Sequence, residues 1–204
     1  MTAIIDYGVG NLFSLKSSFA AIGEKAEVTA DEKIINGADR IILPGVGAFD
    51  KAAKKLKESG MAKVVAEQVK NGKPLMGICL GMQLLFDKSF EYGEHEGLGL
   101  IKGNVVPLSR VIPNEYKIPQ IGWNSLKFQK PSSPLFKYIK EGDFVYFVHS
   151  YYCADCPEAL AATTDYGAPI TAAVQNENVF ACQFHPEKSG DVGLNILRGF
   201  CEVK

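Results

Sequence analysis

The sequence lacks the features of a membrane-bound or exported protein. It contains no run of about 18 apolar residues, the length that a membrane-spanning helix requires. Residues 1–6 lead directly into a predicted strand, without the basic segment and the cleavage site of a signal peptide. The 5 cysteines are odd in number and have no framework spacing. We therefore expect a cytoplasmic protein.

An excess of one charge is also lacking. The 22 basic and 23 acidic side chains leave a formal net charge of −1. This balance gives no support for binding to nucleic acid or to an anionic membrane. A chain of 204 residues predicts one domain, residues 1–204, large enough to bury roughly 70% of the surface that the unfolded chain exposes.

Motifs for cofactors and metals are incomplete. Gly8-Val9-Gly10 lacks the third glycine of a dinucleotide fingerprint, and there is no P-loop lysine motif. Cys153 and Cys156 have the spacing of half a zinc site or of a redox pair, but no second such pair exists. We therefore expect no cofactor and no metal.

What the chain does contain is an alternation of strands and helices. Apolar strands that are each followed by a helix predict a parallel sheet covered on both faces. From about residue 100 to 184 the strands are shorter and separated by turns, which predicts antiparallel additions. The expected fold is α/β, a doubly wound, mostly parallel, flavodoxin-like sheet. The predicted strands are 3–7, 26–28, 40–43, 75–78, 105–106, 123–128, 144–149, 170–174 and 179–184, and the predicted helices are 12–22, 49–58, 61–70 and 191–202.

The strongest local feature is a cysteine between two glycines. The apolar strand 75–78 stops at Cys79, and Gly77 and Gly81 lie two residues to either side. This spacing predicts a nucleophile elbow, a sharp turn in which glycines let the backbone pack closely while the nucleophile is exposed. Residues 82–86 are predicted to open a buried helix, whose dipole favours a thiolate. The alternative is an inert buried cysteine.

A second segment supplies the partners that such a cysteine needs. His185 follows the predicted strand 179–184, Pro186 ends that strand, and Glu187 comes next. A cysteine nucleophile needs an imidazole to hold its proton, and the imidazole needs an acceptor to fix its tautomer. Cys79, His185 and Glu187 are therefore the predicted catalytic residues. The alternative is a strand-end histidine beside a solvated glutamate.

Several segments resemble one known family. Residues 77–83 (G-I-C-L-G-M-Q) and 183–189 (Q-F-H-P-E-K-S) resemble the two signatures of the class I, triad-type glutamine amidotransferases. Segments 6–11, 43–49, 119–124 and 148–152 narrow the resemblance to the glutaminase subunits of imidazole glycerol phosphate synthases. The resemblance covers residues from about 3 to 200. Gln120 departs from the pattern, since family members often carry histidine there.

This resemblance implies an activity and a partner. Glutamine would be hydrolysed to glutamate and ammonia through a thioester on Cys79. The ammonia would pass to a separate (β/α)₈-barrel cyclase subunit in histidine biosynthesis, and this chain is too short to contain that barrel. The glutaminase subunit of such a heterodimer would work poorly alone, and its partner would switch it on.

The loops after the predicted strands offer an oxyanion hole. Ligands bind beyond the carboxyl ends of the strands in an open α/β sheet, so one crevice is expected to gather 8–10, 45–47 and Cys79. Val46, Gly47 and the backbone N–H of Leu80 are the predicted donors, and each donor lowers the barrier by about 3–4 kcal/mol. The alternative is that the glycines of 45–47 serve only a tight turn. Because glycines flank Val46, its peptide can reorient cheaply.

Other residues are assigned by the resemblance. Gln83 and Glu91 would face the glutamine substrate, and Ser150 and Tyr151 would add backbone contacts. For Glu91 the alternative is a solvated loop charge. The partner-facing residues would be Asn11, Trp123, Asn124 and Lys188. The alternative there is a solvated Lys188 and a buried Trp123.

Three other functions stay open. One is a related glutaminase that serves a sugar-amidinating synthase, and another is a stand-alone cysteine hydrolase with the same triad. The third is a glutamine-sensing regulatory subunit in which the triad is idle. Hydrolysis of glutamine, and its dependence on a barrel-type partner, would separate them.

Overall fold

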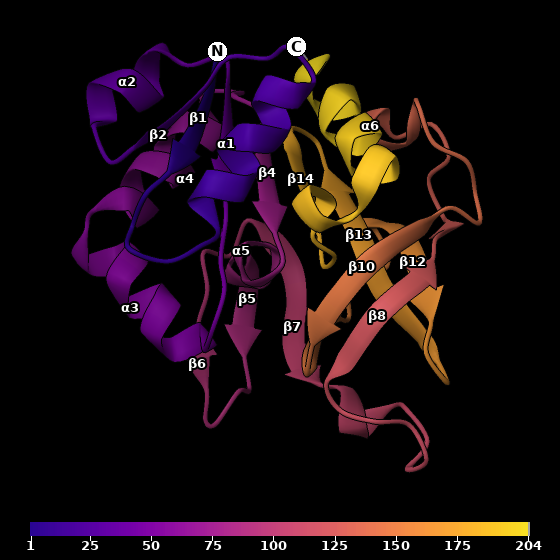
Figure 1. The fold of residues 1–204 in the computed structure, drawn as a ribbon. Helices are drawn as coiled ribbons and strands as arrows, with labels where there is room; N and C mark the ends of the chain where they lie inside the picture. The colour runs from indigo at the N-terminus through magenta and orange to yellow at the C-terminus, as the bar shows by residue number, and fades with distance from the viewer. Residues whose placement is uncertain (204) are drawn as a thin grey trace.

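An eight-stranded sheet runs through the computed structural model, which describes residues 1–203 (Figure 1). The sheet has the order β2-β1-β3-β4-β14-β13-β12-β9. The neighbours from β2 to β14 are parallel, and the strands after β14 are antiparallel, as predicted. The strands are β1 (Thr2–Ile5), β2 (Ala26–Thr29), β3 (Arg40–Leu43), β4 (Leu75–Ile78), β14 (Val179–Cys182), β13 (Pro169–Asn176), β12 (Leu160–Asp165) and β9 (Lys127–Phe128).

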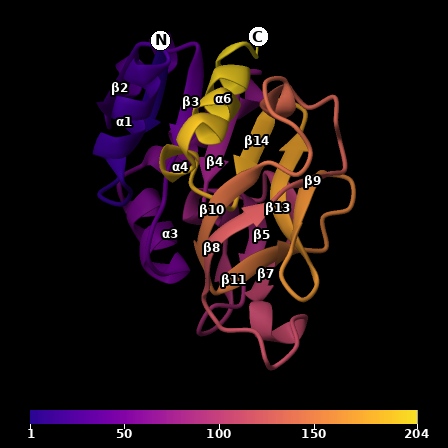
Figure 2. The ribbon, with the colours of Figure 1, turned by 45° about the vertical axis from the view of Figure 1, so that its right-hand side comes forward.

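Helices cover both faces of this sheet, because the central strands are apolar on both sides. β1, β4 and β14 are buried at every position. One face packs on α1 (Leu12–Ala21) and α6 (Gly190–Cys201). The other face packs on α2 (Glu32–Gly37), α3 (Phe49–Glu58) and α4 (Met61–Lys70). Figure 2 shows α1 and α6 in front of the sheet, in indigo and yellow.

Two smaller sheets follow the elbow in sequence. A four-stranded sheet has the order β11-β7-β5-β6, and an antiparallel ribbon joins β8 to β10. In the ribbon Gln120 pairs with His149 and Trp123 pairs with Tyr146, so each pair shares one face. The strands are β5 (Phe86–Ser89), β6 (His95–Glu96), β7 (Ile101–Pro107), β11 (Tyr151–Ala154), β8 (Gln120–Ser125) and β10 (Phe144–His149).

The helix after the elbow is shorter than predicted. α5 covers Leu80–Leu84, and Phe86 already begins β5. All residues from 80 to 86 are buried, so this segment lies inside the molecule and has no solvent-facing side. An all-apolar pattern does not distinguish a buried helix from a buried strand, which explains the error.

Several elements were not predicted as such, namely α2, β5, β6, β11, β12 and three short 3₁₀ helices. α2 begins after Asp31, whose carboxylate accepts a hydrogen bond from the N–H of Lys33 at 2.8 Å and so caps the helix. β11 and β12 are further strands of the C-terminal half. Short 3₁₀ helices cover Leu108–Arg110, Pro134–Phe136 and Pro186–Lys188. Within the described residues, no helix has the length and the apolar character needed to cross a membrane.

Candidate active site

Cys79 lies in a strained turn between β4 and α5. Its backbone has φ 54° and ψ −113°, a left-handed conformation that non-glycine residues rarely adopt. A Cβ on Gly81 would lie 1.9 Å from the carbonyl oxygen of Leu43, and one on Gly77 would lie 2.8 Å from the carbonyl oxygen of Gly81. Only glycine fits at these two positions, so the predicted elbow is present in the structure.

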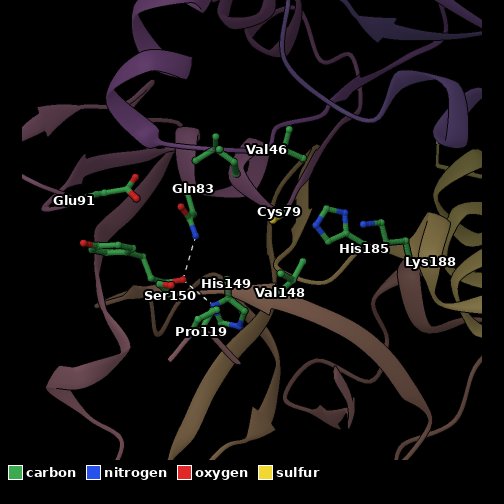
Figure 3. A pocket seen from close by; sticks show the side chains of 13 residues that line it. Val46, Cys79, Gln83, Glu91, Pro119, Val148, His149, Ser150, His185 and Lys188 are labelled. Carbon is green, nitrogen blue, oxygen red and sulfur yellow. Dashed lines mark hydrogen bonds between the residues drawn. The ribbon is translucent and has the colours of Figure 1, made fainter. Parts of the chain in front are cut away.

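His185 and Glu187 meet Cys79 at the end of β14. The Nδ1 atom of His185 lies 2.8 Å from Oε1 of Glu187, and the side chains are 3% and 1% exposed. The N–H of His185 donates to the carbonyl of Tyr146 on β10 at 2.9 Å, which fixes the loop. Figure 3 shows the imidazole beside Cys79 at one side of the cavity. The structure therefore brings the three predicted residues together.

The electrostatics of this group favour a charged imidazole. Burial opposes the positive charge on His185, but hydrogen bonds with Cys79 and Glu187 and their negative charges outweigh it. The net effect raises the pKa of His185 to about 9. At neutral pH an imidazolium therefore faces the cysteine, and in acyl transfer it can pair with a thiolate and donate a proton to a leaving group.

Gln183 is a residue of the site to which the sequence reasoning assigned no role. It is fully buried, and its Nε2 lies 3.7 Å from Sγ of Cys79, where it donates a hydrogen bond. Its Oε1 accepts a hydrogen bond from Nε2 of Gln83 at 3.0 Å. A signal was available, because an amide inside the apolar run 179–184 must find a buried partner.

A cavity of about 340 Å³ opens over Cys79 (Figure 3). All the residues predicted for the oxyanion hole and for substrate binding line it, together with Lys188. The predicted loop 8–10 is not among its lining residues. Instead, a Cβ on Gly10 would lie 3.1 Å from the Pro44 side chain, and the Tyr7 hydroxyl donates to the Pro44 carbonyl at 2.8 Å. This segment therefore packs against Pro44 at the start of the loop 44–47. The lining residues are Val46, Gly47, Cys79, Leu80, Gln83, Glu91, Pro119, Val148, His149, Ser150, Tyr151, His185 and Lys188.

The loop that carries Val46 lies directly against the elbow. A Cβ on Gly45 would be 2.6 Å from the backbone nitrogen of Gly81, so only glycine permits this approach. Gly47 has φ +93°, and the Val46 side chain is 43% exposed. Leu80 is the first residue of α5, and the first N–H groups of a helix have no acceptor within it. The predicted donors are thus neighbours around Cys79.

Both polar residues assigned to substrate binding are held by the protein. Oε2 of Glu91 accepts a hydrogen bond from the N–H of Phe49, the first residue of α3, at 2.6 Å. Glu91 is therefore not the solvated loop charge of the alternative. Nε2 of Gln83 also donates to the Tyr151 carbonyl at 3.1 Å, so the amide is oriented before any ligand binds.

Of the residues assigned to a partner, Lys188 lines the cavity. Lys188 is exposed, and its Nζ lies 5.7 Å from the ring centroid of Tyr146. Trp123 is 52% exposed and packs edge-on against the same ring at 6.0 Å, so it is not a core residue. The Asn124 side chain accepts a hydrogen bond from Gln120 and donates one to the Asp165 carbonyl. Asn11 is half-buried and directly precedes α1.

The remaining cysteines are unlike Cys79. Cys153 and Cys156, the spaced pair, are buried free thiols, as are Cys182 and Cys201. Burial raises the pKa of all four thiols, to about 11 for Cys201. Thiols in that state are poor nucleophiles.

Comparisons with known proteins agree with this geometry. The model of the family "Glutamine amidotransferase class-I" matches residues 3–202. "Imidazole glycerol phosphate synthase subunit HisH" of Caldanaerobacter subterraneus subsp. tengcongensis is 51% identical over 100% of this chain and 98% of its own length. The subunit of the same name from Wolinella succinogenes is 47% identical over 100% of both chains.

Solved structures share the fold. A structure of PurLQS from Thermotoga maritima has a TM-score of 0.77 at 19% identity, covering 98% of this chain and 96% of its own. A crystal structure described as a glutamine amidotransferase has a TM-score of 0.74 at 20% identity, with 98% of each chain covered. At these identities the likeness concerns the arrangement of helices and strands alone.

Proposed function

The chain belongs to the class I glutamine amidotransferase family, and on that premise we propose that it is the glutaminase subunit of an imidazole glycerol phosphate synthase. It hydrolyses glutamine to glutamate and ammonia, and it supplies the ammonia to a cyclase subunit in histidine biosynthesis. The observation that carries this proposal is the cysteine elbow facing a buried, carboxylate-bound imidazole. Residues 1–204 act as one glutamine amidotransferase domain, in the cytoplasm.

The first half of the reaction forms a thioester. The proton of Cys79 is held by His185 as the imidazolium, and the Cys79 thiolate attacks the side-chain amide carbon of glutamine. The negative charge that develops on the amide oxygen is stabilised by backbone N–H groups of Leu80 and of the Val46–Gly47 loop. His185 then gives its proton to the departing nitrogen, the C–N bond breaks and ammonia leaves. Glu187 accepts the hydrogen bond from the Nδ1–H of His185 throughout and keeps the ring oriented.

The second half hydrolyses the thioester. His185 takes a proton from a water molecule, and the oxygen of that water attacks the acyl carbon. The same N–H groups stabilise the second oxyanion, the C–S bond breaks, and Cys79 leaves as a thiolate while His185 keeps the proton. Glutamate leaves, and Gln183 donates to Sγ of Cys79 as the thiolate is regenerated.

The polar wall of the cavity selects glutamine over other amides. The carboxylate of Glu91 suits the α-ammonium group, while Gln83 and the Ser150–Tyr151 segment offer hydrogen bonds to the rest of the amino-acid head. Because Glu91 is bonded to Phe49 and Gln83 to Tyr151, the wall is ordered in advance. Preorganised groups lose less entropy on binding.

The cyclase docks on the outer face of the β8–β10 ribbon. Ile121 and Trp123 on this face are 61% and 52% exposed, and exposed aromatic residues are typical of interface centres. We assign Asn11, Asn124 and Lys188 to the same interface as its polar groups. Lys188 also lines the cavity, so a partner carboxylate paired with it would touch the loop that carries the triad.

The proposal is tested by measuring glutamine turnover in three conditions. These are the isolated chain, the chain with the cyclase, and the chain with the cyclase and its nucleotide substrate. We expect little turnover alone and strong activation in the last condition. Full activity of the isolated chain, unchanged by the cyclase, would refute the coupled function and favour a stand-alone hydrolase.

A further inference from the structure

A chain of polar side chains runs from β8 to the glutamine site. Nε2 of Gln120 donates to Oδ1 of Asn124 at 2.9 Å, and Oε1 of Gln120 lies 3.0 Å from Nε2 of His149. Nδ1 of His149 lies 2.8 Å from the carbonyl oxygen of Tyr151. The same carbonyl accepts a hydrogen bond from Gln83, as Figure 3 shows with dashed lines. Gln120 and His149 are cross-strand partners, so the ribbon itself sets their contact.

The far end of this chain is the nucleophile. Gln83 donates both to the Tyr151 carbonyl and to Gln183, and Gln183 donates to Sγ of Cys79. Gln83 uses both of its amide hydrogens in these two bonds. The orientation of its amide, and so the shape of the glutamine site, depends on where the Tyr151 carbonyl points.

A single N–H on His149 cannot donate to both neighbouring oxygens, the Tyr151 carbonyl and Oε1 of Gln120. The side chain is 6% exposed, and burial lowers its pKa to about 4 despite the bond to Tyr151. A neutral imidazole has one N–H, yet Nδ1 faces a carbonyl and Nε2 faces the amide oxygen of Gln120. A backbone carbonyl only accepts, so the N–H must be on Nδ1. Nε2 then needs a donor.

Gln120 supplies that donor when its amide turns over. The nitrogen and oxygen of an amide are distinguished by their hydrogen bonds, and the turned amide donates its N–H to Nε2 of His149. Asn124 must turn as well, which places its oxygen against the Asp165 carbonyl, 3.3 Å from the present amide nitrogen. The two acceptors that then face each other are Oδ1 of Asn124 and the Asp165 carbonyl, instead of Nε2 of the buried imidazole and Oε1 of Gln120. Their position is exposed, so water can donate to them.

We propose that His149 is a positioning residue for the glutamine substrate, which it serves by donating from Nδ1 to the Tyr151 carbonyl, and that Gln120 selects this tautomer. The proposal rests on the proposed function and names a further residue of the same site. Asn124 follows the exposed Trp123 on β8, so a partner that shifts this strand also shifts the Gln120 amide. The chain is therefore a physical connection between the docking face and the glutamine site.

Two substitutions of His149 separate the roles of its nitrogens. In His149→Asn the amide nitrogen reaches the position of Nδ1, so the bond to Tyr151 is kept and the contact with Gln120 is lost. In His149→Gln the amide reaches the position of Nε2, so the bond to Tyr151 is lost. With the complete complex and its nucleotide substrate, we expect the KM for glutamine to rise roughly tenfold in His149→Gln. In His149→Asn it should stay within about threefold of the original value.

The change must lie in KM rather than in kcat, and alkylation of Cys79 by iodoacetamide should keep its rate. Equal effects of both substitutions, or no effect of either, would overturn the proposal. A loss of kcat with unchanged KM would also overturn it.

A second measurement needs no substitution. The chain has 3 histidines, so the ¹⁵N signals of their imidazoles can be assigned. At neutral pH we expect His149 to be neutral with the proton on Nδ1, and a proton on Nε2 alone would overturn the proposal. This result is independent of glutamine turnover. If the original complex fails to hydrolyse glutamine, the proposed function fails, and the spectrum still decides whether His149 holds the Tyr151 carbonyl.

Discussion

His185 and Glu187 form a buried pair in which Nδ1 of the imidazole lies 2.8 Å from Oε1 of the carboxylate. Oε2 of Glu187 is buried and has no hydrogen-bond partner among the described residues. The carboxylate therefore acts on the imidazole alone, as a charge and as an acceptor. An unpartnered buried carboxylate oxygen is costly, which indicates that this arrangement serves the site rather than stability.

Replacing Glu187 by glutamine should shift the pH profile. The carboxylate favours the protonated imidazole, so its removal lowers the pKa of His185 from about 9. The protonated form donates to the departing ammonia and is lost as pH rises through that pKa. In the original protein the alkaline limb of kcat should fall near pH 9. In Glu187→Gln we expect this limb at lower pH and kcat reduced roughly 100- to 10,000-fold.

The matched control is Glu67→Gln, an exposed carboxylate on α4. It should leave the profile unchanged. Measurement of kcat against pH on the complex with the cyclase decides the matter. An alkaline limb at the same pH in Glu187→Gln would show that the carboxylate does not set the charge of His185.

A glutamine analogue that carries an electrophile should label Cys79 alone. The other four cysteines are buried free thiols with raised pKa values, so they hold little thiolate at neutral pH. Cys79→Ala should abolish both labelling and turnover while the protein still folds. Peptide mass spectrometry identifies the modified residue. Labelling of Cys153, Cys156 or Cys201 with Cys79 untouched would contradict the assignment of the nucleophile.

Gly81→Ala should disrupt the elbow. The added Cβ would lie 1.9 Å from the carbonyl oxygen of Leu43, a backbone atom that moves only if β3 moves. We expect a loss of roughly 3 kcal/mol or more in the free energy of unfolding, or no folded protein. The matched control is Gly37→Ala in α2, where nothing lies within 4 Å of the new Cβ. There we expect a gain of about 0.5–1 kcal/mol. Urea denaturation compares the two, and equal effects would mean that the close approach is not required.

Lys188→Ala should weaken activation by the cyclase. The ammonium group is exposed beside Tyr146 at the cavity edge, where a partner carboxylate can pair with it. We expect the activation factor, the ratio of turnover with and without the liganded cyclase, to fall about tenfold. The melting temperature should change by less than about 3 °C, because a surface lysine contributes little to stability.

Lys54→Ala is the matched control for Lys188. This lysine is 73% exposed and pairs only weakly with Glu58, at 3.8 Å. It should keep the full activation factor. A Lys188→Ala protein that is activated as strongly as the control would remove Lys188 from the docking face.

The sequence alone determined the elements whose signals are local. The bounds predicted for 40–43, 49–58, 61–70 and 75–78 agree with β3, α3, α4 and β4, because apolar spacing and Gly60 mark them within a few residues. The elbow was readable for the same reason, since two glycines and one cysteine specify it. The predicted triad followed from chemistry, because the chain has 3 histidines and one of them is followed by a proline and a glutamate.

The tertiary structure decided what depends on residues far apart in the chain. Gln183 meets Cys79 across a separation of 104 residues, Glu91 reaches Phe49 across 42, and His149 meets Gln120 across 29. The end of α5 at Leu84 was decided in the same way, because residues 80–86 are all buried and their apolar pattern marks no boundary. No periodic pattern encodes such contacts. They arise because a closed core must pair most of its buried polar groups, and only the assembled sheets show which groups lie side by side.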